Sequence, residues 1–207
     1  MADANITKKA LASALKELMK TTSFEKTTVG DICKACGMNR KSFYYHFKDK
    51  YDLANWIYFT EFISEIKSKD YASSWMFFED MCIYFSENKN FYRKLFRVQE
   101  QNSFSEYFLE FLRSVLRDYV REIYQDTENI GFYTDFYADA IFSAINRWLL
   151  SRNNGMPPEK FVSLVHSCLI GSAAAVLQEA EKPGSAEESV PDAGRLHKTK
   201  SAESNSV

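Results

Sequence analysis

Two cysteines and a histidine are the residues whose types and spacing first suggest chemistry in this sequence. Cys33 and Cys36 form a Cys-x-x-Cys pair, and His46 follows ten residues later. A structural zinc site needs four ligands at suitable spacing, and no second pair of cysteines or histidines lies nearby. A redox-active pair is expected beside a βαβ pattern, which the sequence lacks. We therefore expect no metal here and interpret the cysteines as small residues that allow close packing.

The rest of the sequence gives no indication of catalysis. It has no convincing Ser-His-Asp set, no glycine-rich phosphate loop and no carboxylate pair on a recognisable scaffold. We therefore expect a protein that is not an enzyme and that needs no cofactor. The start does not resemble a signal peptide, and four cysteines without secretory context are typical of a reducing compartment. We expect a cytoplasmic protein with no membrane partner.

Charge is unevenly distributed along the chain. Residues 1–51 hold ten Lys or Arg against five acidic residues, which is about +5, whereas the remainder holds 16 against 23, which is about −7. A basic N-terminal module on an acidic body is typical of a protein whose module binds a polyanion. An ordinary lysine-rich surface is the alternative that charge alone leaves open.

Apolar spacing predicts an all-α fold with about nine helices. Glycine and proline number only seven and four in 207 residues, which also favours helices. The expected helices cover residues 5–20, 29–36, 40–46, 49–68, 73–88, 90–99, 103–125, 130–152 and 158–180. We expect residues 1–50 to form one domain and residues 51–180 a second. Residues 181–207 lack aromatics and are rich in Ser, Glu and Pro, which predicts a disordered tail.

The cysteine pair belongs to a predicted helix-turn-helix. Thr28 and Asp31 can form a capping box, Gly37 can end the first short helix, and Asn39 can cap the second. At 100° per residue, a second helix that buries Phe43 turns Lys41, Ser42 and Tyr45 outward, with Tyr44 on the flank. Cations, a hydroxyl and phenols on one exposed face suit contacts with phosphates and groove edges.

The segment TTVGDICKACGMNRKSFYYHFKDKYDL, residues 27–53, resembles the DNA-binding signature of the TetR/AcrR family of bacterial transcription regulators. The match includes the Tyr-Tyr-His-Phe run and the following lysine. The resemblance implies a three-helix DNA-binding domain followed by a helical effector and dimerisation domain. It implies DNA contacts from Thr28, from Arg40, Lys41, Ser42, Tyr44, Tyr45 and His46 in the recognition helix, and from Lys50 on phosphate.

The resemblance also implies a homodimer, formed through the helices at about 130–152 and 158–180, on a palindromic operator. The residues LIGSAAAV give the last helix a small-residue face that allows another helix to approach closely. Phe142, Ile145, Trp148 and Leu149 are expected to give the preceding helix an apolar face for the partner.

An effector is expected in the second domain, where the family places a ligand cavity. Trp56, Trp75, Phe78 and Tyr107 are the candidate contacts, although aromatic residues at helical spacing are usually core residues. The segments at 47–63 and 91–112 are similar to regulators of dihydroxyacetone-kinase operons, which implies control by a protein co-activator as the alternative. A helical interaction scaffold that does not bind DNA is the alternative from another class.

Overall fold

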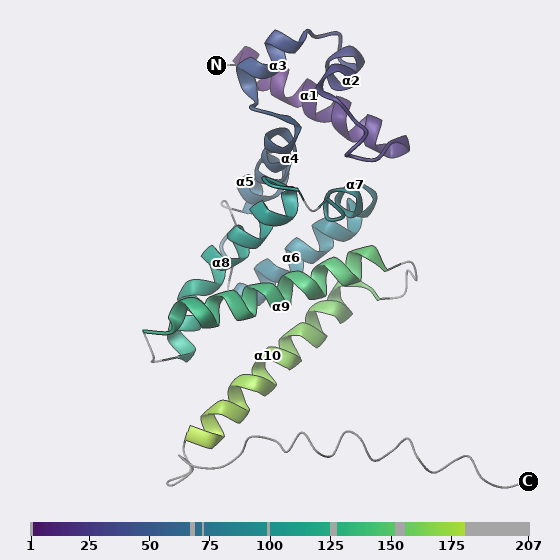
Figure 1. Ribbon diagram of the computed structural model, residues 1–207. Helices are drawn as coiled ribbons and strands as arrows, with labels where there is room; N and C mark the ends of the chain where they lie inside the picture. Colours follow the sequence, from purple (N-terminus) through teal and green to yellow (C-terminus); the bar gives the residue numbers. More distant parts are fainter. Residues whose placement is uncertain are drawn as a thin grey trace, which may run out of the picture. The chain divides into compact units, whose positions relative to one another are not determined.

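A computed structural model describes residues 2–66, 69–71, 73–98, 100–124, 128–151 and 156–180. All regular structure in these ranges is helical, and they contain no strand (Figure 1). The predicted all-α class is therefore confirmed. The chain divides into two compact units, residues 1–168 and residues 169–207. The tail predicted at 181–207 lies outside the described residues.

Three helices form the N-terminal module: α1 (Ala2–Thr21), α2 (Val29–Ala35) and α3 (Arg40–His46). Leu11, Leu15 and Met19 recur every four residues of α1 and are buried, because this spacing places them on one helix face. They share the core with side chains from α2 and α3. Ile6, near the start of the same helix, is 64% exposed.

The boundaries of α2 and α3 follow from local hydrogen bonds. The Thr28 hydroxyl accepts from Asp31 N at 3.1 Å, and the Asp31 carboxylate accepts from Thr28 N at 2.9 Å. Gly37 ends α2 in the left-handed region, with φ of +68°, which a residue with a Cβ rarely adopts. Asn39 then caps α3 by accepting from Ser42 N at 2.8 Å. The predicted helix-turn-helix is confirmed in these details.

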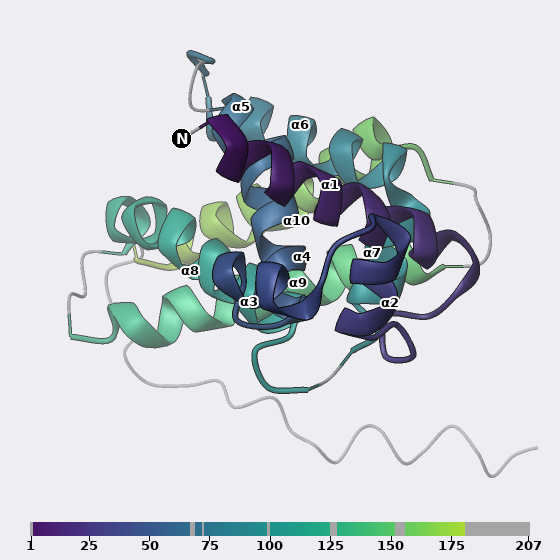
Figure 2. The ribbon, with the colours of Figure 1, turned by 90° about the horizontal axis from the view of Figure 1, so that it is seen from above.

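A continuous helical stretch leads from the module into the body. It consists of α4 (Lys50–Tyr58), the π-helical turn η1 (Phe59–Ile63) and α5 (Ser64–Ile66). Asp49 caps its start by accepting from the amides of Tyr51 and Asp52, each at 2.8 Å. Seen from above, α1 crosses α4 and its C-terminal half lies beside α7 (Figure 2).

The body continues with α6 (Ser74–Glu87), α7 (Lys89–Leu95), α8 (Phe104–Ile123), α9 (Ile130–Leu150) and α10 (Pro158–Ala180). Its core is built mainly from aromatic rings. Tyr58 is fully buried and stacks on Phe85 at 5.6 Å between ring centroids, with Phe62 and Phe104 each at 5.5 Å. None of the described helices is both long and apolar enough to cross a bilayer.

Candidate nucleic-acid interface and effector region

The recognition helix α3 is held by two buried phenylalanines. Phe43 is 0% exposed and Phe47 3%, and their rings contact each other at 5.8 Å. Fixing these two side chains in the core turns the opposite face of α3 outward, as the angular spacing predicts. Tyr45 is accordingly 84% exposed and Tyr44 57%. Lys41 is exposed as well, so a cation and two phenols share the outer surface.

Arg40 lies at the start of α3 and extends across the first turn of α2. A Cβ built on Gly30 would lie only 2.7 Å from Arg40 Nη2, so the guanidinium occupies space that a larger residue would fill. The capping bonds from Thr28 lower the pKa of the Asp31 carboxyl, and the positive charges of Lys34 and Arg40 lower it further. Arg40 is thereby placed beside the first turn of α2, near Gly30 and Asp31.

His46 and Thr28 both have contacts within the module. The imidazole of His46 meets the Tyr45 ring edge-on, with centroids 4.9 Å apart, at the end of α3. The Thr28 hydroxyl donates to Asp31 Oδ2 at 2.6 Å while it caps α2. These contacts fix the two side chains at the exposed surface of α2 and α3, and their contact with DNA stays a prediction.

Lys50 is placed differently from the expectation of a free phosphate ligand. Its ammonium donates to the carbonyls of Phe24, Glu25 and Thr27 at 2.8, 3.0 and 3.1 Å. It also lies 4.7 Å from the centroid of the Phe24 ring, and burial lowers its pKa. Three acceptors satisfy all three N–H groups of an ammonium. In this conformation Lys50 positions the loop between α1 and α2 instead of reaching out to a phosphate.

The four predicted effector contacts do not come together in one place. Trp56 faces the N-terminal module, where its ring contacts Phe47 at 5.7 Å. Trp75 and Phe78 contact each other at 5.9 Å, and Trp75 also meets the His166 ring of α10 at 4.2 Å. Tyr107 lies by Tyr58, with ring centroids 6.4 Å apart. Aromatic packing explains their separate positions, and their contact with an effector stays a prediction.

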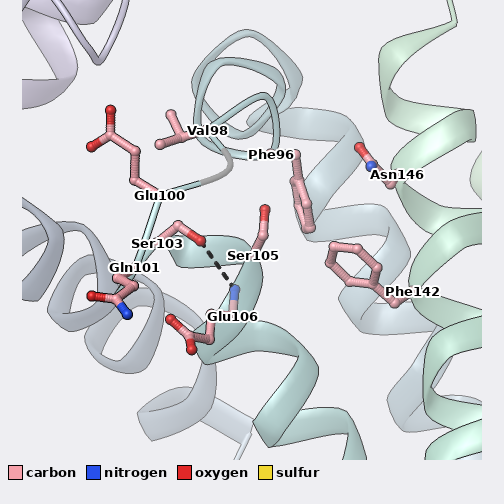
Figure 3. Close-up of a pocket in the computed structure, with 9 residues that line it drawn as sticks. All are labelled: Phe96, Val98, Glu100, Gln101, Ser103, Ser105, Glu106, Phe142 and Asn146. Carbon is pink, nitrogen blue, oxygen red and sulfur yellow. Dashed lines mark hydrogen bonds between the residues drawn. The ribbon is translucent and has the colours of Figure 1, made fainter.

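A pocket of about 340 Å³ lies instead between the end of α7, the α7–α8 loop, the start of α8, and α9 (Figure 3). Its wall is formed by Phe96, Val98, Glu100, Gln101, Ser103, Ser105, Glu106, Phe142 and Asn146. None of the predicted effector residues is among them. This pocket could not be predicted from the sequence, because its polar residues at 100–106 form no recognisable motif and Asn146 comes from a distant helix.

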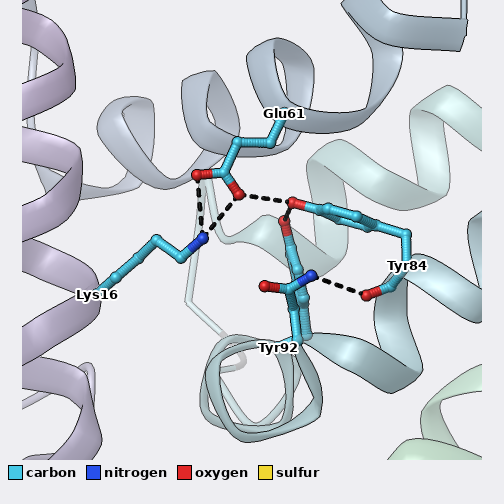
Figure 4. A network of polar contacts seen from close by, with 5 residues as sticks. Lys16, Glu61, Tyr84 and Tyr92 are labelled. Atoms are coloured by element: carbon cyan, nitrogen blue, oxygen red, sulfur yellow. Dashed lines mark hydrogen bonds and ion pairs between the residues drawn. The ribbon is translucent and has the colours of Figure 1, made fainter.

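A polar network connects α1 with the body (Figure 4). Lys16 Nζ lies 2.7 Å from Glu61 Oε2, and the same carboxylate oxygen accepts from the Tyr84 hydroxyl at 3.1 Å. The hydroxyls of Tyr84 and Tyr92 are 2.7 Å apart. Burial raises the pKa of both phenols, so they are neutral hydrogen-bonding groups. Glu61 lies in the π-helical turn, and π-helical turns frequently occur at functional sites.

Models of known sequence families match both the helix-turn-helix and the helical body. Residues 11–56 match the family described as "Bacterial regulatory proteins, tetR family", and residues 73–171 match the description "Transcriptional regulator C-terminal region". The chain belongs to the TetR family of transcriptional regulators. Members of this family regulate transcription and are not enzymes. The first match covers the helix-turn-helix, and the second covers α6 to α9 and the first part of α10.

One similar TetR-family regulator is the HTH-type dhaKLM operon transcriptional activator DhaS of Lactococcus lactis subsp. lactis (strain IL1403). The two are 28% identical over 175 residues, which cover 80% of this chain and 89% of the relative. A solved structure of a dihydroxyacetone kinase operon activator DhaS has a TM-score of 0.61 at 24% identity, covering 82% of this chain and 97% of that one. A TetR regulator from Streptococcus agalactiae 2603V has a TM-score of 0.58 at 22% identity, covering 79% and 96%. These structural matches show the shared fold.

The residues predicted to form an apolar dimer face on α9 were wrong. Ile145 and Leu149 are 0% exposed, Trp148 stacks on Phe161 at 4.7 Å, and Phe142 contacts Phe96 at 5.8 Å. Ile145 and Leu149 therefore pack inside the subunit, and Phe142 and Trp148 are half-buried against other rings of the same subunit. The exposed apolar residues of these helices are others, namely Phe132 and Phe136 on α9 and Leu164 on α10.

The cysteines of this regulator fit the interpretation as packing residues. Cys33 is 3% exposed, and burial raises the pKa of its thiol, which keeps the thiol neutral. The Cys36 thiol donates to the carbonyl of Ile32 at 3.3 Å. Among the residues that the structure describes, no group of three or more His, Cys, Asp or Glu side chains is placed to hold a metal ion.

Proposed function

We propose that this regulator is a homodimer that binds a palindromic operator through α3 and responds to an effector bound by its helical body. The exposed face of α3 is the observation that carries this proposal. Lys41, Tyr44 and Tyr45 are exposed on a short helix that Phe43 and Phe47 anchor in the core. A rigid helix with a cation and phenols on its outer face matches the needs of major-groove recognition.

Binding of the regulator to DNA from its own promoter region tests the proposal. We expect Lys41→Ala combined with Tyr45→Ala to weaken selective binding at least tenfold, because both exposed side chains would lose their contacts with DNA. Arg117→Ala is the matched control, since it removes a charge from an exposed position of α8. Undiminished binding by the double variant, or no palindrome-selective binding by the wild type, would contradict the proposal.

A second version, in which a protein co-activator acts on the body, is supported by two observations. One is the similarity to an operon activator. The other is the aromatic core around Tyr58, where ring contacts occupy the space between α4 and α8. A kinase or kinase-like gene beside the regulator's gene would favour this version, whereas an efflux pump or enzyme operon would favour a small molecule.

The scaffold alternative differs from both versions in its response to salt. Binding to phosphates releases counterions, so affinity must fall steeply as salt rises. A partner captured by the N-terminal module with an affinity independent of salt would support a scaffold and contradict DNA binding as the role of α3.

A further inference from the structure

The pocket in Figure 3 carries chemistry that the family assignment does not specify. Two buried polar atoms on its wall, Ser105 Oγ and Asn146 Oδ1, have no hydrogen-bond partner among the described residues. A buried polar atom without a partner costs about 1–3 kcal/mol, so such atoms require an explanation. Both atoms lie on walls of one pocket, and a bound molecule that hydrogen-bonds to them would remove this cost.

The charged residues of the wall limit what that molecule can be. Glu100 and Glu106 are the charged residues among the described residues of the wall, which include no Lys, Arg or His. Arg97, in the same loop, is exposed and does not line the pocket. The wall itself contributes only negative charge, which disfavours anions, and the Lys50 ammonium that interacts with Glu100 lies outside the wall. Asn146 Oδ1 is an acceptor, so the molecule must also donate a hydrogen bond.

The apolar part of the wall adds a third requirement. The rings of Phe96 and Phe142 contact each other in a tilted arrangement, with centroids 5.8 Å apart and an interplanar angle of 48°, and Val98 of the loop also lines the pocket (Figure 3). Aromatic faces attract organic cations as well as apolar groups. A pocket of about 340 Å³ is at the lower end of the usual range for small-molecule sites.

We propose that this pocket binds a small organic amine in its ammonium form, with Asn146 and Ser105 as hydrogen-bond partners and Glu100 as counter-ion. This inference rests on the proposed function, because it names the class of effector. It differs from the expected site, since none of Trp56, Trp75, Phe78 and Tyr107 lines the pocket.

Glu100 also gives the pocket a direct connection to the DNA-binding module. The Tyr51 hydroxyl donates to Glu100 Oε2, and Tyr51 lies in the first turn of α4, four residues after Phe47. The Tyr51 ring also contacts Phe24 edge-on at 5.1 Å. An ammonium group that takes Glu100 as its counter-ion competes with Tyr51 for the carboxylate. Amine binding therefore loosens the attachment of α4 to the α7–α8 loop.

Three probes with the same ring and different head groups test the site. They are 2-phenylethylamine, 2-phenylethanol and phenylacetate, titrated into the full-length protein and followed by amide chemical shifts in 1H–15N NMR spectra. We expect the amine to shift resonances of residues 96–106 and 142–146 with at least tenfold higher affinity than the alcohol, and phenylacetate to leave them unchanged. Equal affinities for the three probes, or amine-induced shifts confined to other regions, would overturn the proposal.

Substitutions separate the roles of the wall residues. Glu100→Gln should weaken the amine at least tenfold and leave the alcohol unchanged, because it removes charge and preserves shape. Asn146→Leu should weaken both, and Glu110→Gln, at an exposed position of α8 outside the pocket, should weaken neither. Glu100 is exposed, so the folding of Glu100→Gln is not in question even if Asn146→Leu proves unstable. Unchanged amine affinity in Glu100→Gln would contradict the proposal.

Operator binding distinguishes failure of this inference from failure of the proposed function. We expect the amine to change the operator affinity of the wild type at least threefold and to have no such effect in Tyr51→Phe, which cannot donate to Glu100. A protein that binds its operator but not the amine would retain the proposed function and refute the amine site. A protein that binds the amine but no DNA would retain the amine site and refute the proposed function. An undiminished amine effect in Tyr51→Phe would contradict the connection through Glu100.

Discussion

In the N-terminal module, some side chains are exposed at the surface and others stabilise the fold. Tyr45 is 84% exposed and contributes little to the core, whereas the Lys50 ammonium is enclosed by three carbonyls. The position of Tyr45 could be predicted from the helical period and one buried phenylalanine. The carbonyl contacts of Lys50 could not be, because they depend on how a loop 23 to 26 residues earlier in the chain folds back onto α4.

A substitution at Gly30 tests the role of Arg40. We expect Gly30→Ala to leave the protein as stable or to stabilise it by up to about 1 kcal/mol, since alanine favours helices over glycine. The new methyl group would lie 2.7 Å from the present position of Arg40 Nη2 and must displace this flexible side chain. Operator affinity should therefore fall while the urea midpoint is unchanged or higher. Unchanged affinity would show that the position of Arg40 does not matter for DNA binding.

Tyr51 gives a prediction about pH. Burial and the hydrogen bond to Glu100 raise the pKa of the Tyr51 phenol to about 12, from an ordinary value of 10.0. Because the folded state holds this proton more tightly, the contribution to stability is present below pH 10 and is lost as pH rises through about 12. NMR of Cζ-labelled tyrosine should show the shifted titration. Glu100→Gln should lower this pKa only in part, because burial remains the larger cause.

At the level of the helices, sequence patterns predicted some boundaries correctly and missed other features. Local caps at Thr28, Asn39 and Asp49 gave the starts of α2, α3 and α4 directly. The stretch predicted as one regular helix over 49–68 contains a π-helical turn at Phe59–Ile63, which no glycine or proline announces. Likewise, the apolar residues of α9 could face the body or a partner, and periodicity cannot distinguish the two.

The π-helical turn places Glu61 against α1, and a double-mutant cycle can measure that contact. We expect Lys16→Met and Glu61→Gln to show a coupling energy of about 0.5–1 kcal/mol in urea unfolding, at the upper end for partly exposed ion pairs. The pair Lys20–Glu17 is a matched control, because its side chains are 69% and 71% exposed. Its coupling should be smaller. Equal coupling in the two pairs would refute a special role for Glu61.

At the scale of the whole molecule, regulation requires that the module and the body be connected. Within the described part of the chain, three polar links connect them: Lys16 with Glu61, Tyr51 with Glu100, and the Lys94 ammonium with the carbonyls of Met19, Lys20 and Thr22. Sequence patterns did not predict these links, since each joins residues that are 45 to 75 positions apart. An effector bound by the body, as proposed above, would have a physical route to α1 and α4 through these links.

The proposed dimer can be tested by a substitution on the exposed face of α9. We expect Phe136→Glu to fold normally and to weaken self-association at least thirtyfold, because the side chain is 60% exposed in the subunit and an aromatic anchor is typical of interface centres. Ile6→Glu is the control, since Ile6 is 64% exposed on α1. Sedimentation velocity should show a monomer for Phe136→Glu and a dimer for Ile6→Glu. A stable Phe136→Glu dimer would place the interface elsewhere.

The salt dependence of binding to promoter DNA tests whether α3 recognises an operator sequence. The measurement compares a fragment of the protein's own promoter region with a scrambled fragment of equal length between 50 and 200 mM salt. If Arg40, Lys41 and Lys48 of each protomer neutralise one phosphate each, the log–log slope should be about −5. Affinity for the promoter fragment should exceed that for the scrambled one by at least about 1,000-fold. Equal affinities for the two fragments, or a slope near zero, would contradict a sequence-specific DNA-binding role for α3.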